Sequence, residues 1–108
     1  MTEKTFKIPL YGGKFKLIFT DDLSKVESEH CLIHSEDTNA LVFQIGGSYY
    51  AAFETKEITP GIIAHEAKHI VNYVFKDICA KLDPDNDEPE CYFLKWIVDK
   101  IHENLPKK

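Results

Sequence analysis

The segment after residue 58 predicts a long helix that is apolar on one side and carries two histidines on the other. Thr59 suits the N-cap position and Pro60 the first helical position, and no further Pro or Gly occurs from Ile62 to Phe75. These signals predict a helix over residues 59–82. Its apolar stripe consists of Ile63, Ala67, Ile70, Val71, Val74 and Ile78.

The two histidines of this helix have the spacing of metal ligands. Each helical residue advances by about 100°, so His65 and His69 lie within about 40° of each other, one turn apart. Both imidazoles can therefore reach one ion, while Glu66 projects beside the pair, where it can take a proton from a bound water. The plainer alternative is an amphipathic helix whose histidines only face solvent.

A catalytic zinc usually takes three protein ligands and leaves one position for water or substrate. No third histidine follows His69 within helical reach, so the remaining candidates are acidic. We favour Glu88, at the start of a second helix, with Glu90 as the alternative, and either carboxylate could instead stabilise the helix start. The full acidic set is Asp83, Asp85, Asp87, Glu88 and Glu90.

The rest of the chain predicts two β-hairpins, a short helix and a final helix. The alternating segments 5–10 and 14–20 flank a Gly-Gly turn, and 40–45 and 48–54 flank a second one. A short helix capped by Asp21 or Asp22 lies between them, and periodic apolar residues predict a final helix over 88–105, with Asp85 and Glu88 at capping-box spacing. The predicted fold class is α+β: a small, mainly antiparallel sheet of two hairpins with a short helix, packed on two longer C-terminal helices.

Composition limits the classes of function. A chain of 108 residues with 44% hydrophobic residues predicts one compact domain, residues 1–108. Its net charge of −5 and scattered lysines argue against a nucleic-acid partner. No apolar run approaches about 20 residues and no signal peptide is visible at the N-terminus, so we expect no membrane association and a cytoplasmic location. Three cysteines without a CxxC pair fit a reducing compartment.

Residues 62–69 and 87–94 together resemble small zincin-type metallopeptidase domains of the HExxH-plus-Glu, gluzincin-like kind, such as those encoded by bacteriophages and prophages. The resemblance implies one Zn²⁺ bound by His65, His69 and Glu88, with Glu66 as the general base of peptide-bond hydrolysis. It also implies a peptide or protein substrate, bound as an added strand along residues 48–53. Tyr92 stands where larger gluzincins carry an Asp one turn after the glutamate ligand.

Two other classes stay open from the sequence. The first is a catalytically inactive zincin-like metal-binding scaffold or regulatory interaction protein. The second is an acidic interaction protein that binds no metal and whose histidines are incidental. Metal content separates the second class from the others, and turnover that depends on Glu66 separates an enzyme from a scaffold.

Overall fold

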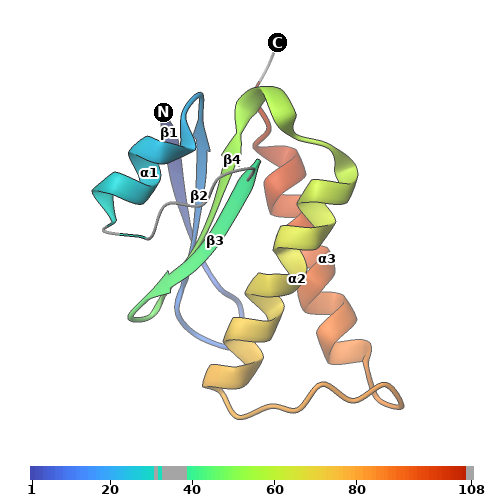
Figure 1. Ribbon diagram of the computed structural model, residues 1–108. Coiled ribbons are helices and arrows are strands. Elements are labelled where there is room, and N and C mark those ends of the chain that lie inside the picture. Colours follow the sequence, from blue (N-terminus) through green and yellow to red (C-terminus); the bar gives the residue numbers. More distant parts are fainter. Residues whose placement is uncertain (31, 33–38, 107–108) are drawn as a thin grey trace.

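The computed structural model describes residues 1–30, 32 and 39–106, and it has a four-stranded sheet with helices on both faces (Figure 1). The α+β class predicted from the sequence is confirmed. The elements in chain order are β1 (Thr2–Lys7), β2 (Lys14–Thr20), α1 (Leu23–Glu29), β3 (Ala40–Ile45), β4 (Ser48–Glu54), the 3₁₀ turn η1 (Thr55–Glu57), α2 (Pro60–Asp77) and α3 (Glu88–Glu103).

The sheet has the order β1-β2-β4-β3. Each hairpin is antiparallel, and the two hairpins join through a parallel pairing of β2 with β4, from Lys14 opposite Ser48 to Thr20 opposite Glu54. The mainly antiparallel sheet is thus confirmed. The expectation that residues 48–53 receive an added strand is wrong, because β4 is hydrogen-bonded on both sides and β3 is the outer strand on that side.

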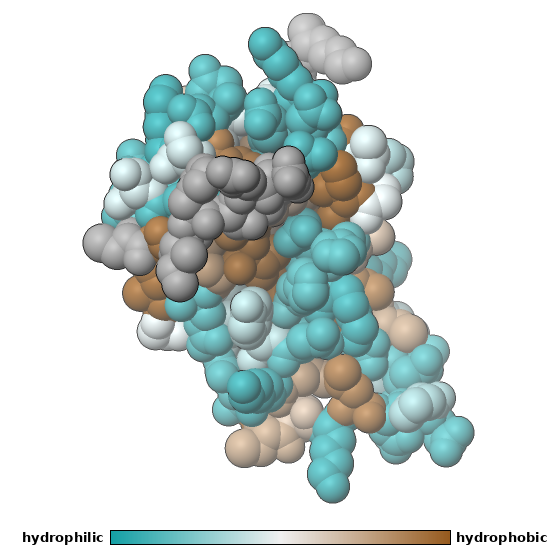
Figure 2. Space-filling view, in the orientation of Figure 1, coloured by the Kyte–Doolittle hydropathy of each residue, from teal (hydrophilic) through white to brown (hydrophobic). Residues whose placement is uncertain are grey.

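Alternation along the two central strands divides their side chains between two apolar clusters. On β2, Phe15 and Leu17 face the cluster shared with α2 and α3, whereas Ile18 faces the smaller cluster under α1. On β4, Ala51 faces the helix pair and Ala52 faces α1. The outward side of α2 carries mostly hydrophilic residues (Figure 2). The helix pair therefore packs on one face of the sheet, as predicted.

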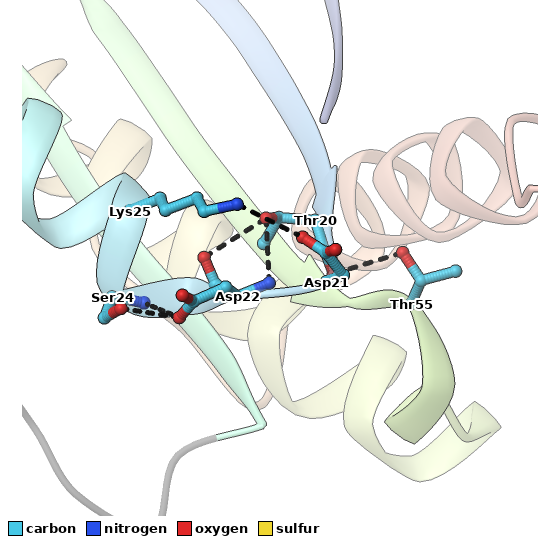
Figure 3. A network of polar contacts seen from close by, with 6 residues as sticks. All are labelled: Thr20, Asp21, Asp22, Ser24, Lys25 and Thr55. Carbon is cyan, nitrogen blue, oxygen red and sulfur yellow. Dashed lines mark hydrogen bonds and ion pairs between the residues drawn. The ribbon is translucent and has the colours of Figure 1, made fainter.

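Polar contacts tie the ends of the parallel strands together where α1 begins (Figure 3). The Thr55 hydroxyl donates to the Thr20 carbonyl oxygen at 3.1 Å, which links the residue after β4 to the end of β2. Asp22 accepts from the Ser24 amide at 3.0 Å and caps α1, as the sequence predicted for Asp21 or Asp22. The hydroxyl of Ser24 also donates to Asp22, and these two hydrogen bonds from Ser24 lower the pKa of the Asp22 carboxyl. The chain therefore leaves β2 in a fixed direction.

Helix α2 starts as predicted but ends at Asp77, five residues before the expected end. Cys79 has a left-handed backbone with φ of 60°, and the amides of Ala80 and Cys79 donate to the carbonyls of Phe75 and Lys76. This pattern is a Schellman ending, which usually has Gly at the left-handed position. Because this position holds Cys and not Gly, the sequence shows no stop signal before Asp83 and Pro84.

The start of α3 also differs from the prediction in its capping. Asp87, not Asp85, holds the N-cap position, and its side chain makes no capping hydrogen bond.

Within the part of the chain that the structure describes, no helix is long and apolar enough to cross a membrane.

A tyrosine and a glutamine of the hairpin β3–β4 hold the C-terminal end of α2. The Tyr49 hydroxyl and the Gln44 amide both donate to the Asp77 carboxylate, each at 2.5 Å. The buried position of Tyr49 and the adjacent carboxylate disfavour the phenolate, and they raise the pKa of Tyr49 to about 12. The helix is thereby fixed against the outer half of the sheet.

We expect Cys79→Gly to raise the free energy of unfolding by about 0.5–1 kcal/mol, because Gly adopts the left-handed conformation without the steric cost of a Cβ atom. Cys79 is exposed, so little packing is lost. Cys91→Gly is the matched control: it places Gly inside α3 and should cost about 1 kcal/mol. Urea unfolding of both variants measures the effect, and equal destabilisation by the two would contradict this account.

The Tyr49–Asp77 contact predicts a loss of stability at high pH. Because the pKa of Tyr49 is raised in the folded protein, its contribution is complete below pH 10 and is lost as the pH rises from 10 towards 12. Urea midpoints between pH 9 and 12 should therefore fall less steeply for Tyr49→Phe than for the parent. Tyr92→Phe, at an exposed tyrosine, should follow the parent. Parallel curves for the parent and Tyr49→Phe would contradict the prediction.

Candidate metal centre

The rotation of α2 about its axis is fixed by the side chains that it buries. Five of the six predicted stripe residues are buried; the exception is Ile78, which lies past the helix end and is 40% exposed. Phe75 is buried in addition. Thr59 caps the helix by accepting from the Ile62 amide at 3.1 Å, as predicted. With this stripe against the sheet, His65 and His69 project on the exposed side.

The imidazoles of His65 and His69 meet at their Nε2 atoms, which are within hydrogen-bond distance of each other. Their Nε2 atoms are 3.2 Å apart, and their ring planes are inclined by 74°. Two imidazole nitrogens that bind one zinc at about 2.0–2.1 Å with a tetrahedral angle lie about 3.3 Å apart. The separation is compatible with two ligands of one zinc ion, and the i, i+4 spacing brings the two rings together as expected.

Glu66 lies beside the histidine pair in a less exposed environment. Its Oε1 atom is 3.8 Å from His65 Nε2, and its side chain is 13% exposed, compared with 68% for His65. Desolvation raises the pKa of Glu66, and the nearby charges of His65 and His69 lower it by less. A carboxylate with this environment is a stronger base than a solvated one.

The two candidate acids on α3 point in different directions. Glu88 and Glu90 are two positions apart, so they lie about 160° apart around the helix. Glu90 faces α2, where its Oε2 accepts from Lys68 Nζ at 2.7 Å, and Glu88 is exposed. Among the described residues, no group of three or more His, Cys, Asp or Glu side chains is placed to hold a metal ion. The third ligand stays a prediction.

The Lys68–Glu90 contact is the feature of this region that sequence reasoning missed. Lys68 Nζ also donates to Asn72 Oδ1 at 3.0 Å, so one ammonium bridges two turns of α2 and the first turn of α3. The spacing of Lys68 and Asn72 by four residues is a visible local signal. The contact with Glu90 crosses 22 residues and a loop, so no local pattern indicates it.

A pocket of 260 Å³ lies near the start of α2 and is separate from the histidine pair. Pro60 and Ile63 line it together with Val98 and His102 of α3. Ile63 and His65 are two positions apart, so they project from nearly opposite sides of α2. The pocket thus lies on the side of α2 away from the histidines.

Comparison with known proteins finds no family model, no curated protein and no solved structure that matches this chain. The function of this protein is therefore inferred from the geometry of the site and from the motif resemblance.

We expect the parent protein to bind zinc and to become more stable when it does. Free zinc at about 100 times its dissociation constant should add about 2.7 kcal/mol to the free energy of unfolding, because only the folded chain brings the imidazoles together. His69→Ala should abolish both the binding and the stabilisation, whereas His102→Ala, an exposed histidine of α3, should keep both. Melting curves with zinc or chelator, together with metal analysis, test this; unchanged curves and no near-stoichiometric ion would refute it.

Proposed function

We propose that this protein is a zinc-dependent peptidase of the zincin type. The observation that carries the proposal is the pair of Nε2 atoms 3.2 Å apart on the exposed side of α2, with the desolvated carboxylate of Glu66 beside them. His65 and His69 would hold the zinc with a carboxylate from the start of α3. A zinc ion at this position supplies Lewis acidity, which polarises a carbonyl and makes a water more acidic.

Glu66 performs the proton transfers in this proposal. It accepts a proton from the attacking water as the water oxygen bonds to the scissile carbonyl carbon, and it gives that proton to the amide nitrogen as the C–N bond breaks. The products are a carboxylate and an amine. The raised pKa of Glu66 favours both transfers, because its carboxylate binds a proton more strongly than a solvated one and still releases it to an amine.

The outer strand β3 supports a peptide as the substrate class. Within the described residues β3 is hydrogen-bonded on one side only, so its other side can accept an extended peptide. Gln44 of β3 bonds to Asp77 of α2, and Glu66 lies eleven residues before Asp77, within about 20° of the same flank of the helix. A peptide added to β3 would therefore run along the flank of α2 that carries Glu66.

The second candidate function is a zincin-like scaffold that binds metal and regulates another protein without hydrolysis. Two observations favour it: Glu90 is paired with Lys68, and the described residues hold no three-membered ligand group. A site with only two protein ligands binds zinc more weakly than a catalytic site does.

The cytoplasmic location expected from the sequence is part of either proposal, and the free thiols of Cys79 and Cys91 agree with it.

A substitution at Glu66 distinguishes a peptidase from a metal-binding scaffold that does not hydrolyse peptides. Glu66→Gln keeps the size of the side chain but removes the base, so zinc should stay bound while peptidase activity falls by about 100-fold or more. His69→Ala should instead lose zinc and activity together. A peptide library and zinc analysis on the same preparations give both readouts. Hydrolysis by Glu66→Gln at the parental rate would show that Glu66 is not the base.

A further inference from the structure

One ammonium group connects the histidine helix to the start of α3. Lys68 stands between the two histidines in the sequence, and its Nζ contacts Glu90 Oε2 at 2.7 Å and Asn72 Oδ1 at 3.0 Å. The side chains of Lys68 and Glu90 are 39% and 20% exposed, so solvent reaches this ion pair only in part.

The position of Asn72 shows where the Glu90 carboxylate lies relative to the histidines. Asn72 is one turn beyond Lys68 and three residues beyond His69, so it is a direct neighbour of both on the helix surface. Because Asn72 Oδ1 and Glu90 Oε2 are both within hydrogen-bond distance of the same ammonium, Glu90 borders the exposed side of α2 that carries His65 and His69. It is the α3 acid on this border; Glu88 projects from the other side of α3.

We propose that Lys68 and a zinc ion compete for Glu90: Lys68 holds the carboxylate outside a three-membered ligand group with the histidines, and Glu90 leaves the ammonium for the ion when His65 and His69 bind zinc. This inference rests on the metal site of the proposed function. It assigns Glu90 as the third ligand, and it makes Lys68, a residue inside the motif, a determinant of zinc affinity.

The exchange is energetically possible because the Glu90 carboxylate interacts more strongly with a zinc ion than with the Lys68 ammonium. A partly exposed Lys–Glu pair contributes little to stability, since solvent screens it and two long side chains lose freedom. A carboxylate bound to a divalent cation interacts with twice the charge and at shorter range. The Lys68 ammonium keeps its hydrogen bond to Asn72 after Glu90 has left, so the free energy lost when the ion pair breaks is limited.

The test measures zinc affinity by competition with a chromophoric chelator, independently of peptide hydrolysis. Glu90→Gln should weaken zinc binding by about 10- to 100-fold or more, because losing even a residue that only supports a metal ligand costs that range. Lys68→Met should strengthen zinc binding by about fivefold, because Glu90 no longer has to leave an ion pair. Glu88→Gln tests the other candidate acid: it should leave the affinity unchanged, and weaker zinc binding by this variant would overturn the assignment of Glu90.

Two further variants separate competition from general electrostatics. Lys95→Met removes the same charge from an exposed pair with Asp99 on α3 and should not change zinc affinity. In the double variant Lys68→Met/Glu90→Gln the fivefold gain should disappear, because the carboxylate for which Lys68 competes is gone. The visible spectrum of bound Co²⁺ gives an independent readout: it should change in Glu90→Gln and stay unchanged in Glu88→Gln. Melting curves establish that each variant is folded.

The outcomes distinguish this inference from the proposed function. If the parent binds no zinc, both fail. If the parent binds zinc through His69 but Glu90→Gln binds it equally well, the proposed metal site stands and the assignment of Glu90 is overturned. If Lys68→Met weakens zinc binding, or its gain persists in the double variant, Lys68 does not compete for Glu90 and the exchange is overturned.

Discussion

The burial of one apolar stripe on α2 against the sheet is the constraint on which the candidate site depends. Ile70, Val71 and Val74 are fully buried there, and each such side chain contributes about 1.5–3 kcal/mol relative to exposure. A rotation of α2 by one residue position would expose part of this stripe and bury polar groups. The core thus sets the direction of His65 and His69, although neither histidine belongs to it.

The parallel pairing of β2 with β4 also affects the position of the candidate site, although neither strand contributes a residue to it. It places β4 inside the sheet and leaves β3 as the outer strand beside α2. Tyr49 and Gln44 then reach Asp77 from adjacent strands and hold the end of α2 beside this outer strand. Among the described residues, the flank of α2 that carries Glu66 therefore lies beside the open edge of β3.

Local signals in the sequence were sufficient to predict the strands, but they were insufficient to predict how the two hairpins pair. The strands 14–20, 40–45 and 48–54 were predicted with the bounds that the structure has, because Gly-Gly turns and alternation mark both ends. The first strand is shifted by three residues: it was predicted over 5–10, and β1 runs from Thr2 to Lys7, so residues 8–10 lie past its end. The join between hairpins was not predictable, because alternating strands carry no record of which neighbour pairs in parallel.

Residues that act alone on a helix face were predictable, and contacts between helices were not. The spacing of His65 and His69 determines their convergence, and Thr59 and Pro60 determine where the helix begins. The end of α2 was missed because Cys79 takes a conformation that sequence rules reserve for Gly or Asn. The choice between Glu88 and Glu90 depends on the rotation of α3 against α2, which the packing of Phe93 and Ile97 sets.

The motif also assigns different environments to neighbouring residues of one helical turn. A metal ligand has to be open to the ion, and His65 is exposed; a general base benefits from desolvation, and the Glu66 side chain is largely shielded. These two requirements are met because consecutive helix positions are about 100° apart, so the histidines project to solvent while Glu66 turns to the flank beside the sheet. For Glu66, the proposed base, desolvation outweighs the attraction of two adjacent imidazoles and raises the pKa. The same packing that exposes the two histidines therefore also shields the carboxylate, so the environments agree with the roles proposed for these residues.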